Sequence, residues 1–156
     1  GIEELGPPTV RLANGWTGVR TDFTLQNYQD QTLQCSIWRP AGKDPAEVYS
    51  AVVYLHGNSS CRVDALRTGV LDVVSSMNVA VVAFDFAGSG MSDGEHVTLG
   101  WHEHHDVATV VRHLTNEGMR KVALWGRSMG AVSAIMYCQS QQYETLPPAC
   151  LVLDSP

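Results

Sequence analysis

Short continuous apolar runs alternate along the chain with stretches in which apolar residues recur every three or four positions. Continuous runs of this kind are typical of parallel strands that are covered on both faces. Four of them are predicted as buried strands: Ala51–Leu55, Val79–Phe84, Val122–Trp125 and Cys150–Leu153. The periodic stretches predict three helices: Arg62–Met77, Thr98–Asn116 and Met129–Gln141. Strands that alternate with helices specify a parallel sheet with helices on its faces.

The start of the chain has a different pattern. Two β-like runs, Arg20–Gln26 and Gln31–Trp38, are separated by the polar segment Asn27–Asp30, which predicts an antiparallel hairpin. Residues 1–18 are rich in proline and glycine and are predicted as an irregular lead-in. We therefore expect an α/β fold, with residues 19–156 in one domain whose mostly parallel sheet begins with antiparallel strands.

The composition of the chain argues against nucleic-acid binding, a membrane-spanning segment and a disulfide-stabilised fold. The chain of 156 residues carries 10 Lys and Arg against 16 Asp and Glu, a formal charge of −6, so it offers no basic field to a nucleic acid. No apolar run is long enough to cross a bilayer, and the absence of a signal peptide favours a cytoplasmic location. The cysteines form no Cys-x-x-Cys pair and are predicted to be reduced, mostly buried thiols: Cys35, Cys61, Cys138 and Cys150.

The strongest chemical signal is the sequence Gly126-Arg127-Ser128-Met129-Gly130, which matches G-x-S-x-G. It begins where an apolar strand ends and stops where a helical stripe begins, the strand–turn–helix setting of a nucleophile elbow. In so tight a turn, side chains two residues before and after the serine would collide, which accounts for Gly126 and Gly130. Ser128 is the candidate nucleophile. The alternative is an ordinary glycine-bracketed helix start that Ser128 caps.

A serine nucleophile needs donors for the oxyanion, and two backbone amides are predicted to supply them. One is the amide of Met129, the residue after the nucleophile. The other is the amide of Asn58, because His56-Gly57-Asn58 follows directly after the strand Ala51–Leu55. Gly57 is expected to let the backbone turn so that this amide points toward Ser128, and His56 to support the loop.

Four motifs in this order resemble the α/β-hydrolase superfamily, most closely its serine-aminopeptidase-like and acyl-protein-thioesterase-like members. They are His56-Gly57-Asn58, Asp85-Phe86-Ala87-Gly88-Ser89-Gly90-Met91-Ser92, Gly126-Arg127-Ser128-Met129-Gly130-Ala131, and Leu151-Val152-Leu153-Asp154-Ser155-Pro156. The resemblance covers about Thr21 to Pro156, the N-terminal portion of such a domain, which ends after the strand near Asp154. It implies a mixed sheet, a triad in the order serine, acid, histidine, and two-step acyl transfer to water.

The chain departs from the family pattern at its end and in one loop. All six histidines precede Ser128, whereas the resemblance implies a histidine and an acid after it, so both are expected beyond Pro156. Related proteins have a similar Asp-Ser-Pro sequence without using its aspartate, and Asp154 is therefore not taken as the acid. The 156 residues alone are expected to be inactive. Ala87 stands where many relatives place an arginine.

Two other motifs resemble a zinc site and a dinucleotide-binding loop but lack the spacing that each requires. The stretch His102-Glu103-His104-His105-Asp106 lacks the His-Glu-x-x-His spacing of zinc proteases and is predicted as the solvated face of a helix. Gly88-Ser89-Gly90 follows a strand, but Asp93 occupies the place of the third glycine of a dinucleotide fingerprint. Neither a metal nor a cofactor is expected.

The sequence thus predicts a serine hydrolase that acts on an ester, thioester or amide of a small molecule or an acylated protein. An alternative is a non-catalytic protein that keeps this scaffold as an interaction module. A second alternative, a flavodoxin-like or Rossmann nucleotide-binding domain, has the same alternation of strands and helices.

Overall fold

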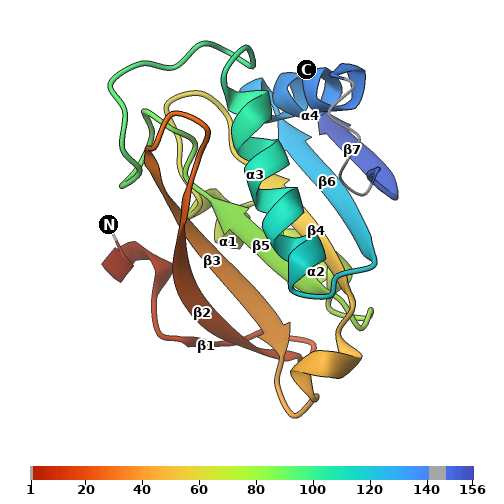
Figure 1. Cartoon of the computed structure of the whole chain (residues 1–156). Coiled ribbons are helices and arrows are strands. Elements are labelled where there is room, and N and C mark those ends of the chain that lie inside the picture. The colour runs from red at the N-terminus through yellow and green to blue at the C-terminus, as the bar shows by residue number, and fades with distance from the viewer. Residues whose placement is uncertain (1, 141–146) are drawn as a thin grey trace.

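The computed structural model describes residues 2–140 and 147–156, which form a seven-stranded mixed sheet in the order β1-β2-β3-β5-β4-β6-β7 (Figure 1). The antiparallel part consists of β1 (Thr9–Arg11), β2 (Thr17–Gln26) and β3 (Thr32–Pro40). The parallel part consists of β4 (Ser50–Leu55), β5 (Ala80–Phe84), β6 (Lys121–Arg127) and β7 (Cys150–Asp154). The predicted hairpin and the predicted parallel strands are confirmed.

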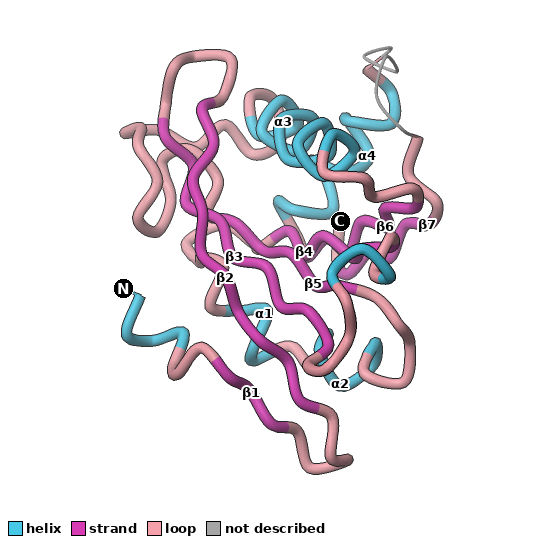
Figure 2. Tube along the Cα trace, turned by 60° about the horizontal axis from the view of Figure 1, so that its bottom comes forward, coloured by secondary structure: helices cyan, strands magenta, loops and turns pink. Residues whose placement is uncertain are grey.

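Helices cover both faces of the sheet (Figures 1 and 2). The two long ones, α3 (Glu103–Asn116) and α4 (Met129–Gln139), pack on one face, and the short α1 (Asp64–Arg67) and α2 (Val70–Val74) on the other. Alternate residues of β5 enter the two cores, Val82 with α3 and α4 and Val81 with α1 and α2, as the two-residue period of a strand requires.

The helix predicted over Arg62–Met77 is wrong as a single element. Gly69 has φ +76°, a left-handed conformation that glycine adopts without a Cβ penalty, and it separates α1 from α2. The apolar residues Val70 and Val74 still face the core. Their spacing therefore identified the buried face but not the break.

The helix predicted from Thr98 begins five residues later, at Glu103. Leu99 and Gly100 have φ of +55° and +114°, which excludes them from a right-handed helix. A Cβ on Gly100 would lie 2.8 Å from Cγ1 of Val132, so α4 packs against this turn. The end predicted for the third helix, Gln141, lies outside the described residues.

The lead-in is more ordered than the sequence suggested. It contains a 3-10 turn, Ile2–Leu5, and β1, which pairs with β2; a second 3-10 turn, Pro45–Glu47, precedes β4. Leu5 is buried beneath α1 and α2, and Nη1 of Arg20 donates to its carbonyl oxygen at 2.8 Å. A single apolar residue in a polar segment carries too weak a pattern to predict this docking.

The cysteines are more exposed than the sequence predicted. All four cysteines are free thiols, but only Cys35 is buried; Cys150 is exposed and the other two are half-buried. Most of the thiols are therefore not buried, contrary to the prediction.

Over residues 2–140 and 147–156, we find no helix with the length and apolar character that a membrane crossing requires.

Candidate active site

The carboxyl ends of β4, β5 and β6 lie at one edge of the sheet because these strands are parallel. β4 lies between the other two. The loop after β4, residues 56–63, therefore lies between the loop after β5 and the turn from β6 into α4. Sites in open parallel sheets form at this edge, and each motif singled out in the sequence is found there.

Ser128 occupies the turn between β6 and α4 with φ +49° and ψ −115°. Such a conformation is uncommon for a residue other than glycine and costs on the order of 1–3 kcal/mol. The Ser128 amide donates to the carbonyl oxygen of Asp154 at 2.8 Å, and its carbonyl oxygen accepts from the Val132 amide at 3.0 Å. Its side chain is exposed and forms no capping hydrogen bond. Ser128 thus occupies the N-cap position of α4, but its side chain does not cap the helix.

The two flanking glycines are required by close contacts, as predicted. A Cβ on Gly126 would meet the carbonyl oxygen of Gly130 and lie 2.5 Å from the Ala131 amide nitrogen. A Cβ on Gly130 would meet the carbonyl oxygen of Leu55 and lie 2.6 Å from its carbonyl carbon. The obstructing atoms are backbone atoms, which cannot rotate away. The turn therefore packs directly on the end of β4.

The loop after β4 lies against Ser128, but the role predicted for Gly57 in turning the chain is wrong. Its φ is not positive, and the left-handed residue of this loop is Ser59, with φ +59°. A Cβ on Gly57 would lie 3.6 Å from Cβ of Ser128. Gly57 therefore leaves space beside the serine instead of enabling the turn.

The amides of Asn58 and Met129 have no acceptor among the described residues. The Asn58 side chain is occupied nearby, because its Oδ1 accepts from the Ser59 amide at 2.9 Å. Met129 is the first residue of α4, where amides lack intrahelical partners and the helix dipole favours negative charge. Within the described residues, both amides are thus unpaired: that of Met129 directly follows the exposed serine, and that of Asn58 follows Gly57, which packs beside it.

His56 is fully buried and its ring joins two loops. Its Nδ1 lies 2.7 Å from the carbonyl oxygen of Gly57, and its Nε2 accepts from the Phe86 amide at 3.1 Å. Because one partner is an acceptor and the other a donor, the ring is neutral with its proton on Nδ1. Burial lowers the pKa of His56, in agreement with a neutral ring. His56 supports the loop and has no nitrogen free to act as a base.

The sequence analysis missed a buried ion pair between Arg62 and Asp85. Nη1 of Arg62 lies 2.5 Å from Oδ2 of Asp85, and the Arg62 amide donates to Oδ1 at 2.7 Å. Oδ2 also accepts from the Met91 amide at 2.9 Å, while a Cβ on Gly90 would meet this carboxylate. The pair ties the loop after β4 to the loop after β5. In the sequence, the one feature that could have indicated this ion pair is the position of Asp85 directly after a buried strand.

The acidic residues at the start of α3 are buried, so the predicted solvated face is wrong. Glu103 accepts from the Thr98 amide and hydroxyl and from the Gly100 amide, each at 2.7 Å. Asp106 accepts from the Ala87 amide at 2.9 Å and from Nδ2 of Asn27 at 2.8 Å. Burial raises the pKa of Asp106 to about 6. These carboxylates hold the loops around the site.

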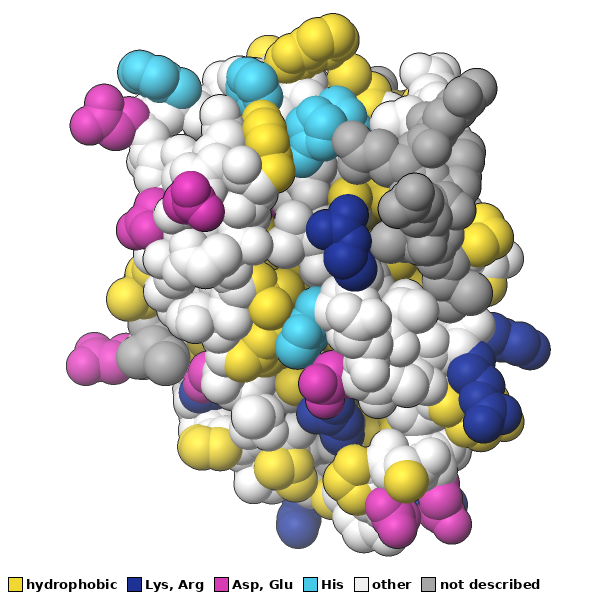
Figure 3. Space-filling model, viewed as in Figure 1, with side chains coloured by type: hydrophobic (Ala, Val, Ile, Leu, Met, Phe, Trp, Pro, Cys, Tyr) yellow, Lys and Arg dark blue, Asp and Glu magenta, His cyan; other side chains and the backbone are white. Residues whose placement is uncertain are grey.

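Several histidine side chains gather above the start of α3 (Figure 3). Among them, Nδ1 of His102 lies 2.5 Å from the Tyr28 hydroxyl. Within the part of the chain that the structure describes, no histidine forms a hydrogen bond with the Ser128 hydroxyl. The same part contains no group of three or more His, Cys, Asp or Glu arranged to hold a metal ion.

Comparisons with known proteins agree with this geometry. The family model "Serine aminopeptidase, S33" (Hydrolase_4) matches residues 46–156. "Lysophosphatidylserine lipase ABHD12" of Bos taurus is 32% identical over 150 residues, which cover 86% of this chain and 37% of that protein. The Xenopus tropicalis protein of the same name is 30% identical, with coverages of 86% and 38%. The chain thus spans well under half of these relatives.

The fold likeness extends to almost the whole chain. The solved structure of the Pyrococcus furiosus esterase Pf2001 superposes with a TM-score of 0.74 at 24% identity, over 96% of this chain and 58% of that one. The mixed sheet with helices on both faces is therefore an α/β-hydrolase fold, and the nucleotide-binding alternative is set aside. Because the family model covers more than two thirds of the sequence, the chain belongs to the serine aminopeptidase S33 family of α/β-hydrolases.

Proposed function

We propose that this chain carries the nucleophile and the oxyanion hole of a serine hydrolase that cleaves carboxylic esters of lipids. The observation that carries the proposal is the conformation of Ser128, which has a positive φ and an exposed side chain at the end of β6. A turn that costs free energy and presents a hydroxyl above the sheet is characteristic of a nucleophile elbow.

In the proposed reaction, Oγ of Ser128 attacks the ester carbonyl carbon while a base removes its proton. The carbonyl oxygen becomes an oxyanion that accepts hydrogen bonds from the amides of Met129 and Asn58. Collapse of this intermediate breaks the bond to the alcohol, which leaves with the proton. Water then attacks the acyl–serine ester and releases the carboxylic acid.

The base and its acid partner are proposed to be a histidine and a carboxylate beyond Pro156 in the full protein. Support comes from the order serine, acid, histidine that the family resemblance implies, and from the length of the relatives. His56 does not fill this role, since both of its ring nitrogens are occupied.

A lipid ester is the favoured substrate class because the relatives named above are lysophosphatidylserine lipases. Thioesters and acylated proteins remain within the same chemistry, since each presents an acyl carbonyl to the serine. Single-chain ester lipids are therefore the first substrates to test.

The proposal is tested by labelling the full protein with a fluorophosphonate and identifying the labelled peptide by mass spectrometry. We expect the label on Ser128, and we expect Ser128→Ala to lose both labelling and hydrolysis of a monoacylglycerol. Ser155→Ala is the matched control, because Ser155 is also an exposed serine with positive φ, +51°. Labelling that persists in Ser128→Ala would place the nucleophile at another residue, and a full protein with neither labelling nor hydrolysis would support the non-catalytic scaffold.

A further inference from the structure

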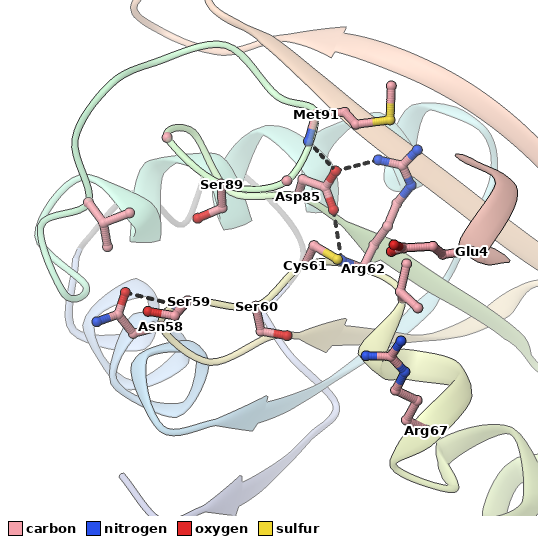
Figure 4. A pocket seen from close by; sticks show the side chains of 14 residues that line it. Glu4, Asn58, Ser59, Ser60, Cys61, Arg62, Arg67, Asp85, Ser89 and Met91 are labelled. Atoms are coloured by element: carbon pink, nitrogen blue, oxygen red, sulfur yellow. Dashed lines mark hydrogen bonds and ion pairs between the residues drawn. The ribbon is translucent and has the colours of Figure 1, made fainter. Parts of the chain in front are cut away.

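A polar cavity of about 540 Å³ lies between the loop after β4 and the loop after β5 (Figure 4). Asn58, Ser59 and Ser60 contribute one wall, and Ser89 and Gly90 another. The remaining walls include Glu4 from the first 3-10 turn and Arg67 from the end of α1. Three hydroxyls and several charged groups make this space better suited to a polar group than to an acyl chain.

The cavity adjoins the proposed reaction centre through two consecutive residues. Gly57 lies against Ser128, since a Cβ added to this glycine would be 3.6 Å from Cβ of the serine, and Asn58 lines the cavity. An ester whose carbonyl oxygen binds the Asn58 amide would therefore have one of its two substituents directed along Ser59 and Ser60. The polar walls favour the alcohol side of the ester.

The charges around the cavity are not equivalent. Arg62 and Asp85 are buried and their charges neutralise each other through an ion pair, with Nη1 2.5 Å from Oδ2. Arg67 is exposed and has no ion pair or hydrogen bond among the described residues. Figure 4 shows the Arg67 side chain extending from α1 on the side of the view opposite Asn58 and Ser59. Among the described residues that line the cavity, Arg67 is thus the cation without a partner.

We infer that this cavity binds an anionic group, a phosphate or a carboxylate, on the alcohol portion of the ester, with Arg67 as its cationic partner. A guanidinium matches either anion with paired hydrogen bonds. The hydroxyls of Ser59 and Ser89 supply further donors. The inference rests on the proposed function, because it assigns a substrate class to the same site.

The test compares two esters with one acyl chain, a lysophosphatidate and a monoacylglycerol, presented to the full protein in neutral detergent micelles. For Arg67→Gln we expect kcat/KM for the lysophosphatidate to fall 10- to 100-fold, the range for a lost hydrogen bond to a charged group. The value for monoacylglycerol should stay within about twofold. Arg112→Gln, which removes an exposed charge from α3, is the control.

The outcomes separate the inference from the proposed function. If the protein hydrolyses both esters and Arg67→Gln changes neither, or changes both equally, the anion subsite is overturned while the hydrolase stands. If neither ester is hydrolysed, the subsite is tested by binding of glycerol 3-phosphate against glycerol. Tighter binding of the phosphate that Arg67→Gln removes supports the subsite, and equal binding overturns it. A carboxylate analogue of the same length then distinguishes the two anions.

Discussion

Three residues in the turn after β6 are determined by space and strain. Gly126 and Gly130 each have backbone atoms where a side chain would begin, whereas Ser128 has a positive φ despite its side chain. The glycines let the turn pack on β4, and the packing in turn holds the serine in a conformation that it would not adopt alone. At each of the three positions, the residue type therefore follows from the space and the backbone conformation of the turn.

Gly130→Ala is expected to destabilise the fold. Its Cβ would meet the carbonyl group of Leu55, and overpacking of this kind costs about 1–3 kcal/mol. A loss of that size lowers the melting temperature by roughly 2–4 °C per kcal/mol in a protein of this length. Differential scanning calorimetry of the two proteins measures the change.

Gly57→Ala serves as the comparison for this stability measurement. Its Cβ would find ordinary contacts at 3.5 and 3.6 Å, and its backbone does not need glycine. We expect its melting temperature to stay close to that of the parent. Equal stability of Gly130→Ala and the parent would mean that the turn relaxes away from β4.

At the scale of elements, α3 organises the loops through carboxylates at its buried end. Glu103 closes the turn at Thr98 and Gly100, and Asp106 joins the loop after β5 to the hairpin residue Asn27. Asp106 accepts two hydrogen bonds but has no cation paired with it in the described structure. A buried carboxylate in this position should make folding depend on pH.

Asp106 is expected to reduce stability as the pH rises from about 4 to about 6. Its pKa is raised from 3.8 to about 6 in the folded protein, with burial as the largest cause. The folded state therefore keeps its proton through a range in which the unfolded chain releases it. The free energy of unfolding contributed by this group falls with rising pH, by on the order of 3 kcal/mol. Urea denaturation at several pH values measures this dependence.

Asp106→Asn removes the titration and should remove this part of the pH dependence. The substitution also turns one acceptor into a donor opposite an existing donor, so we expect lower stability at pH 4. His56 acts in the opposite sense, because its lowered pKa favours the folded state at higher pH. Only the difference between parent and variant therefore reports on Asp106. Identical slopes in both proteins would contradict the assignment.

At the scale of the whole molecule, the sheet has two unlike edges (Figure 2). β1 is three residues long, follows Pro8 and ends in Arg11, features that discourage pairing with another chain. β7 is five residues long and exposed throughout, including Leu151, Val152 and Leu153. Among the described strands, β7 is the edge open to association.

The 156-residue chain by itself is expected to self-associate through β7, since an exposed apolar edge strand is a template for pairing. Val152→Lys should shift the chain toward monomers by placing a charge on that edge. Val73→Lys is the control, because Val73 is exposed on α2, away from the edge. Sedimentation velocity distinguishes the species. Equal association of both variants would show that β7 is not the contact.

The sequence alone determined the β2–β3 hairpin, the four parallel strands, the presence of α3 and α4 between the last three of them, and the position of Ser128 between β6 and α4. These features depend on local spacing: continuous apolar runs for β4, β5 and β6, a three-to-four period for α3, and paired glycines around a serine. Each can be read within a few residues, because the residues involved are neighbours along the chain or along one face. The family resemblance rested on these same local motifs.

Only the tertiary structure decided which polar groups are buried and what they hold together. Arg62 and Asp85 are 23 residues apart in the chain, and Asp106 bonds to Asn27 from 79 residues away. From sequence alone, a charged residue is predicted to be exposed to solvent unless its partners are known. Those partners come together only when the sheet forms. The cavity at Arg67 has the same origin, because its walls come from four separate segments. Local pattern specifies elements, whereas desolvation and pairing of polar groups depend on contacts between them.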